Sequence, residues 1–158
     1  MSVESIATYL EPVRKSVSVP RGVKDAFTIF TARIERWWPL ARYSCTHERA
    51  RTVAIEPRVG GAVYEERDDG ERFPWGRILV WEPPHRFVMT WHPGRDPDVA
   101  QEVEVRFTPE GEATRVDLEH RNWQKLGKDA AKVRESYDGG WPGVLETFRI
   151  ATQTDKGP

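Results

Sequence analysis

Hydrophobic and polar residues alternate along much of the chain. Val103, Val105 and Phe107 alternate with charged residues, and so do Val116 and Leu118. A period of two predicts β-strands with one buried and one solvated face. Strand-like runs of this kind occupy residues 13–19, 52–57, 61–67, 73–81, 85–91, 101–108 and 113–120.

Turn-forming residues separate the later runs. Gly60-Gly61, Asp68-Asp69-Gly70 and Pro83-Pro84 cannot continue a regular ladder, and the PGRDPD and PEGE segments close two further hairpins. Strands joined by such short connections are antiparallel neighbours. The charged residues from Glu65 to Asp69 lie at a predicted hairpin tip, and we expect them to be solvated.

Two segments follow a helical period instead. Val23, Phe27, Phe30 and Ile34 recur at spacings of four, three and four, which predicts a short helix that runs into a second turn at IERWWP. Near the C-terminus, Trp141, Val144, Leu145 and Phe148 share one helical face. Because Pro142 fits either a first turn or a kink, we favour one kinked helix over about residues 128–152.

This order of elements predicts an α+β helix-grip fold. An antiparallel sheet of about seven strands curls around the long C-terminal helix, and two short helices follow the first strand. We expect a single domain over residues 12–152, with flexible ends at residues 1–11 and 153–158. Space remains between the sheet and the last helix unless large side chains fill it.

Composition narrows the function classes. Lys and Arg number 24 against 25 Asp and Glu, so the net charge is −1. Because the sequence contains no block of basic residues, we do not expect a nucleic-acid partner. No apolar run approaches the roughly 18 residues of a membrane span, and no signal peptide is recognised, so we expect a cytoplasmic protein without membrane insertion. The single cysteine, Cys45, precludes an intramolecular disulfide, and we read it as an inert thiol rather than a nucleophile. We predict no metal site and no cofactor, because no histidine pair has a trusted ligand spacing.

Three tryptophans within residues 75–91 make the central hairpin unusually aromatic. They are interpreted either as plain core or as the wall of a ligand cavity. On the first strand of this hairpin, Trp75, Leu79 and Trp81 share one parity with Arg77, whereas Ile78 and Val80 share the other, and a bulge near Gly76 would resolve this. The candidate cavity residues are Trp38, Tyr64, Trp75, Trp81, Trp91, Val105, Leu118, His120, Trp141, Leu145 and Phe148.

Several motifs together resemble a known family. They are RWWP after the first helices, VGGAVYEERDDG, WGRILVWEPPHRFVMTW, TRVDLEH and YDGGWPGVLETF. Across about residues 12–152 the chain resembles the START-like, Bet v 1-like helix-grip superfamily (SRPBCC), in the branch similar to the C-terminal domain of the activator of heat-shock protein 90 ATPase. The resemblance implies a cavity between sheet and C-terminal helix, which in various relatives holds lipids, hormones, polyketides or nothing identified.

Three function classes remain open. The first is a non-catalytic binding protein for a small hydrophobic or aromatic molecule, with no catalytic residues. The second is a cyclase- or hydrolase-like enzyme in which His120 acts with an inward Tyr64 or Arg77. The alternative for His120 is a structural role, as a core histidine hydrogen-bonded to a neighbour. The third, implied by the resemblance alone, is a co-chaperone-like module. The eukaryotic activator carries an additional N-terminal domain for its chaperone, whereas residues 1–11 alone precede the first strand here, so we do not expect the full chaperone mechanism. Homodimerisation is left open.

Overall fold

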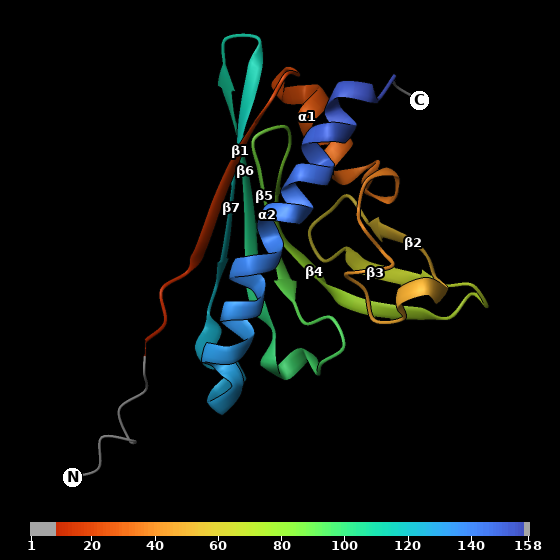
Figure 1. The fold of residues 1–158 in the computed structure, drawn as a ribbon, viewed down its shortest axis with the longest axis vertical. Helices are drawn as coiled ribbons and strands as arrows, with labels where there is room; N and C mark the ends of the chain where they lie inside the picture. Colours follow the sequence, from red (N-terminus) through yellow and green to blue (C-terminus); the bar gives the residue numbers. More distant parts are fainter. Residues whose placement is uncertain (1–8, 157–158) are drawn as a thin grey trace.

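A computed structural model describes residues 9–156 of the chain, and its central element is one antiparallel sheet of seven strands (Figure 1). The spatial order is β1-β7-β6-β5-β4-β3-β2, so every strand from β2 to β7 pairs with its neighbour in sequence. The strands are β1 (Val13–Val19), β2 (Ala50–Ile55), β3 (Ala62–Arg67), β4 (Arg72–Glu82), β5 (Arg86–Trp91), β6 (Gln101–Glu110) and β7 (Ala113–Arg121). The predicted α+β helix-grip fold is confirmed.

Helices occupy the concave side of this sheet. α1 (Val23–Thr31) and the short 3₁₀ helix η2 (Ile34–Arg36) follow β1, as the helical spacing predicted. The long helix α2 (Ala130–Thr154) is gripped by the curled sheet, with α1 beside its C-terminal half (Figure 1). Pro142 lies inside α2, which begins and ends about two residues later than the sequence predicted.

Three further 3₁₀ helices lie in connections between the longer elements. They are η3 (His47–Arg49), η4 (Pro97–Val99) and η5 (Trp123–Asp129), the last leading directly into α2. The loops that carry η3 and η4 follow η2 and β5. The first of these loops leads into the edge strand β2 and the second joins the central strands β5 and β6, and both contribute to the site described below.

Two bulges in β4 explain why its apolar residues do not share one parity. Against β3, Val63 pairs with Gly76 and Tyr64 with Pro74, so Trp75 is the extra residue. Against β5, the register shifts a second time at Leu79, which is exposed. The bulge expected near Gly76 is therefore confirmed, and it directs the Trp75 side chain into the core.

The ends of the described chain are held by contacts. Leu10 packs against the hydrophobic core, and Arg134 donates to the carbonyl of Glu11. At the other end Arg21 donates to the carbonyls of Thr152 and Asp155, and α2 extends through Thr154. The rest of the predicted flexible ends, residues 1–8 and 157–158, lies outside the described residues. Within the described chain, no helix is both long and apolar enough to cross a membrane.

Candidate ligand pocket

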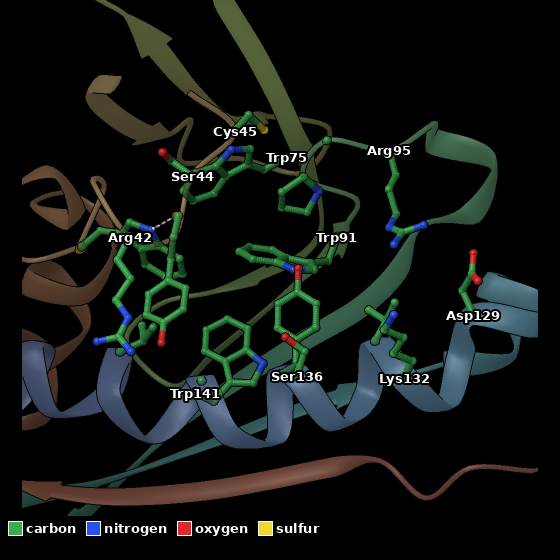
Figure 2. Close-up of a pocket in the computed structure, with 18 residues that line it drawn as sticks. Arg42, Ser44, Cys45, Trp75, Trp91, Arg95, Asp129, Lys132, Ser136 and Trp141 are labelled. Carbon is green, nitrogen blue, oxygen red and sulfur yellow. Dashed lines mark hydrogen bonds between the residues drawn. The ribbon is translucent and has the colours of Figure 1, made fainter. Parts of the chain in front are cut away.

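A cavity of about 660 Å³ opens between α2, the β4–β5 hairpin and two loops. Figure 2 shows Trp141, Ser136 and Lys132 on α2 and Asp129 directly before its first residue, with Trp75 and Trp91 across the pocket from them. The lining comprises Trp38, Arg42, Tyr43, Ser44, Cys45, Trp75, Trp91, Pro93, Gly94, Arg95, Asp129, Lys132, Val133, Ser136, Tyr137, Gly140, Trp141 and Val144. Its volume is typical of sites for small organic molecules, which are about 300 to 1,000 Å³.

One face of α2 forms the floor of the pocket. The lining residues of this helix, with Asp129 directly before it, fall at positions 129, 132, 133, 136, 137, 140, 141 and 144. These spacings of three and four place them on a single helical face. Gly140 lies in the middle of this face, where a Cβ would be in van der Waals contact with the Tyr43 ring, 3.6 Å from its nearest atoms.

Four tryptophans form a continuous aromatic wall. Ring centroids lie 5.2 Å apart for Trp38 and Trp75, 5.5 Å for Trp75 and Trp91, and 5.5 Å for Trp91 and Trp141. The circuit closes through Trp38 and Trp141 at 5.9 Å. All four side chains are less than a tenth exposed, so packing holds their ring planes in place.

Every indole N–H of this wall already has a protein acceptor. The donor–acceptor distances are 2.7 Å from Trp38 to the Tyr43 carbonyl, 2.7 Å from Trp75 to Glu65 Oε1, 3.0 Å from Trp91 to Tyr137 Oη, and 3.1 Å from Trp141 to His120 Nδ1. The wall therefore offers a ligand apolar carbon and aromatic edges or faces rather than indole hydrogen bonds.

Glu65 holds the outer loop against the sheet. The expectation that this residue is solvated is wrong, because Glu65 is fully buried between the loop and Trp75. Its carboxylate accepts from the backbone N–H groups of Cys45 and Thr46 at 2.6 and 3.0 Å and from the Thr46 hydroxyl at 2.8 Å. Burial alone would raise the pKa of Glu65, but these donors and Trp75 outweigh it, so the pKa lies below its ordinary value.

The same arrangement makes the Cys45 thiol unreactive as a nucleophile. Burial, reinforced by the neighbouring Glu65 carboxylate, raises the pKa of the Cys45 thiol to about 12. The reactive form of a cysteine is the thiolate. Although Cys45 lines the pocket, it remains a protonated thiol at neutral pH, as the interpretation of an inert loop cysteine requires.

His120 lies behind the aromatic wall rather than in the pocket. Its Nε2 is 3.2 Å from Gln101 Oε1, and the Gln101 amide nitrogen donates elsewhere, to the Val99 carbonyl. Nε2 therefore carries the proton and Nδ1 accepts from Trp141. Burial lowers the pKa of His120 to about 3. Both nitrogens are engaged, so His120 fixes the Trp141 ring and has no free nitrogen for proton transfer to a ligand.

Charged residues surround the mouth of the pocket. Arg42, Arg95, Lys132 and Asp129 all line it and are exposed. None of the three cations forms an ion pair among residues 9–156. We call these four residues the rim; its net positive charge contrasts with the net charge of −1 for the whole chain.

The structure separates the predicted cavity residues into groups. Trp38, Trp75, Trp91 and Trp141 line the pocket. Val105, Leu118, Leu145, Phe148 and His120 are buried but lie outside the lining.

Two predicted residues lie elsewhere. Tyr64 lies between the buried residues Val63 and Glu65 of β3, so its side chain points to the opposite face of the sheet, where the Arg72 guanidinium lies 4.5 Å from its ring centroid. Trp81 is half-buried and packs against Phe27 beside α1, with ring centroids 5.2 Å apart.

The proposed partners of His120 are also absent from its surroundings. Arg77 is exposed and donates to the Gly60 carbonyl, and Tyr64 faces away. The strand alternation that sent His120 inward is correct, since its side chain is fully buried. The alternation did not reveal that both ring nitrogens of His120 already have hydrogen-bond partners, Gln101 and Trp141.

Sequence reasoning missed most of the polar lining. Tyr137 lies one helical turn before Trp141, so the same apolar stripe extended by one turn would have included it. No periodic pattern in the sequence points to the lining residues that lie in loops, which are Arg42, Tyr43, Ser44 and Arg95. They approach α2 only through tertiary structure, which a local pattern does not encode.

Comparisons with known proteins agree with this architecture. A family model described as "Activator of Hsp90 ATPase homolog 1-like protein" matches residues 23–152. A search of curated proteins found no match.

Among solved structures, the anthrahydroquino-γ-pyrone synthase Txn09 is 41% identical, with a TM-score of 0.63 over 90% of this chain and 97% of that one. The self-sacrificing resistance protein CalC from Micromonospora echinospora is 32% identical, with a TM-score of 0.65 over 95% of this chain and 100% of that one. The Aha1 dimer from Colwellia psychrerythraea shares the fold at 13% identity, with a TM-score of 0.66 over 94% of this chain and 100% of that one.

Proposed function

The chain belongs to the activator of Hsp90 ATPase homolog 1-like family, and we propose that it binds a planar, polycyclic aromatic molecule in the pocket between its sheet and α2. The observation that carries this proposal is the wall of four tryptophans whose N–H groups are all engaged. Such a wall favours the binding of a flat apolar surface. It provides few hydrogen-bonding partners for a sugar or a nucleotide, which need many.

The energetic argument favours an aromatic ligand of several rings. A ring system that removes about 200 Å² of apolar surface from water gains about 5 kcal/mol. Edge-to-face or offset contacts with indole rings add roughly 0.5 to 1.5 kcal/mol for each good pair. Because the wall is already packed, little side-chain entropy is lost on binding.

The name of one relative supports the same ligand class. Txn09, at 41% identity, is named for an anthrahydroquinone-derived γ-pyrone, whose ring system is planar and aromatic. This support is separate from the pocket geometry, since it rests on sequence identity over nine-tenths of the chain.

Gly140 provides a direct test. In the Gly140→Leu variant the new side chain projects from the pocket floor beside Tyr43, whereas Gly139→Leu adds the same side chain where no atom lies within 4 Å. Tryptophan fluorescence should change saturably when the wild-type protein or Gly139→Leu is titrated with an anthracene monocarboxylate. We expect Gly140→Leu to bind at least about tenfold more weakly, because leucine fills space that the rings need. Equal affinity of the two leucine variants would contradict binding in this pocket.

Catalysis of ring closure is a second candidate, favoured by the identity to a protein named as a synthase. A γ-pyrone forms when the phenol oxygen of an ortho-hydroxyaryl β-diketone bonds to the distal carbonyl carbon and that carbon then loses its oxygen as water. This step needs no oxidant and no cofactor. The test is chromatographic detection of the chromone formed from an ortho-hydroxyphenyl β-diketone, with protein and with heat-denatured protein. Equal rates in both samples would exclude this activity for that substrate class.

The co-chaperone-like role, the homodimer and the cytoplasmic location stay predictions. The pocket proposal depends on none of them.

A further inference from the structure

Tyr137 is the most enclosed hydroxyl group of the pocket lining. It lies on the floor helix α2, and its ring packs against His120 with centroids 4.7 Å apart. Its ring is also nearly parallel to that of Trp141, with an interplanar angle of 28° at 6.0 Å. Contacts on several sides therefore fix the ring and, through it, the position of the hydroxyl.

The hydrogen bonding of this hydroxyl is incomplete. Tyr137 Oη accepts the indole N–H of Trp91 at 3.0 Å. Among residues 9–156, no acceptor for the Tyr137 O–H itself is found. A phenol can donate as well as accept. Since the Trp91 N–H already occupies one lone pair, the proton of Tyr137 remains for a partner in the cavity.

The protonation state of Tyr137 suits a donor. Burial raises the pKa of the Tyr137 hydroxyl, while the hydrogen bond from Trp91 and the charge of Arg95 oppose that effect only in part. The group is therefore a neutral phenol at physiological pH. It can donate one hydrogen bond without needing a counter-ion in the ligand.

Resting on the function proposed above, we infer that Tyr137 is the polar anchor of the ligand: its O–H donates to a carbonyl oxygen on the aromatic ring system. The pocket then selects quinone- or ketone-bearing polycycles over hydrocarbons of the same shape. The aromatic wall provides most of the affinity, and Tyr137 provides the preference for one oxygen position. A buried donor left without an acceptor is the physical basis of that preference.

The other hydroxyl groups of the lining are placed differently. Ser136 is exposed on α2, and the Ser44 hydroxyl in the outer loop already accepts from the His47 backbone N–H at 2.8 Å. Tyr43 is half-buried, lies beside the exposed Arg42 and accepts no described side-chain donor that would fix its hydroxyl. Tyr64→Phe is the matched control for Tyr137→Phe, because it removes one tyrosine hydroxyl on the opposite face of the sheet, away from the pocket.

The test compares two probes of the same outline by isothermal titration calorimetry. One is an anthracene monocarboxylate, and the other is the anthraquinone monocarboxylate with its carboxylate at the same ring position. In Tyr137→Phe we expect the affinity for the anthraquinone to fall about tenfold and that for the anthracene to change less than about twofold. In Tyr64→Phe both affinities should stay within about twofold of the wild type.

The ratio of the two affinities isolates the carbonyl contact. Tyr137→Phe also leaves the Trp91 N–H without its acceptor, but any resulting disturbance of the wall weakens both probes alike. Equal losses for the two probes, no loss for the anthraquinone, or the same selective loss in Tyr64→Phe would each overturn the role of Tyr137. Failure of the wild-type protein to bind either probe would overturn the proposed function and the anchor together.

An infrared measurement on the wild-type protein gives an independent readout if Tyr137→Phe does not fold. A carbonyl that accepts a hydrogen bond stretches at lower frequency than the same carbonyl in an aprotic apolar solvent. We expect the carbonyl band of the bound anthraquinone to shift to lower frequency. An unshifted band in the saturated complex would rule out the anchor.

Discussion

Replacing Glu65 by glutamine tests how the outer wall of the pocket is held. Glu65 is fully buried and accepts four hydrogen bonds, from Cys45, from two groups of Thr46 and from Trp75. Glutamine keeps one acceptor oxygen but presents an NH₂ group to donors on the other side. At least two charge-assisted hydrogen bonds are lost, each contributing about 1.5 kcal/mol or more.

We therefore expect Glu65→Gln to lower the free energy of unfolding by about 3 kcal/mol at pH 7, measured by urea denaturation. For a chain of this size that corresponds to a fall of about 6 to 12 °C in Tm. Glu66→Gln is the matched control on the same strand. The partly buried Glu66 pairs with the exposed side chains of Arg51 and Arg72 on the other face, and ion pairs of this kind near the surface contribute only about 0 to 1 kcal/mol.

The pH dependence makes the test sharper. Because the pKa of Glu65 is lower in the folded protein than its ordinary value of 4.5, its contribution to stability is fully present above pH 4.5. The contribution is lost as the pH falls through the folded pKa, where wild-type Glu65 becomes neutral like glutamine. The difference between wild type and Glu65→Gln should therefore be constant from pH 8 to 5 and shrink below pH 4.5. A difference under about 1 kcal/mol at pH 7, or one independent of pH throughout, would refute this reasoning.

Two further predictions concern the Cys45 thiol in the pocket lining and the His120 ring behind the wall. Since the pKa of the Cys45 thiol is raised from 9.0 to about 12, alkylation by iodoacetamide at pH 8 should be about 1,000-fold slower in the folded protein than in denaturant; similar rates would contradict the assigned burial. Because the pKa of His120 falls from 6.5 to about 3 on folding, the unfolded chain takes up this proton first as the pH drops. Wild-type protein should accordingly lose about 2 kcal/mol more stability between pH 7 and 5 than His120→Gln, measured by denaturation at both values, and parallel losses would show that His120 titrates normally.

The strands and the grip on α2 follow from local patterns in the sequence. Alternation in residues 101–120 predicted which side chains of β6 and β7 face the core, and Val103, Val105 and Leu118 are buried as expected. The helical stripe from Trp141 to Phe148 predicted the buried face of α2. These features are set by near neighbours in sequence, so a single chain is enough to reveal them.

The pocket itself depends on contacts between distant segments. Glu65 reads as part of a solvated charge run, yet the loop at Cys45 and Thr46 folds over it and supplies its donors. The alternation of β3 places the Tyr64 side chain on the outer face of the sheet, so the prediction that Tyr64 lines the cavity was wrong. Periodicity gives the face of each residue but not which loop covers that face.

His120 shows the same limit at a single residue. Its inward direction could be read from β7, but its chemistry depends on Gln101 of β6 and Trp141 of α2. Those two partners fix its tautomer and leave neither nitrogen free. A candidate catalytic residue can thus be located from sequence, whereas its role requires knowledge of what it touches.

The most direct test of the account is a crystal structure of the protein with the anthraquinone monocarboxylate bound. We predict that the rings lie in the pocket against the indoles of Trp91 and Trp141, with one carbonyl oxygen within hydrogen-bond distance of Tyr137 Oη and the carboxylate toward the rim. Rings bound elsewhere on the surface, with this pocket filled only by water, would contradict the account.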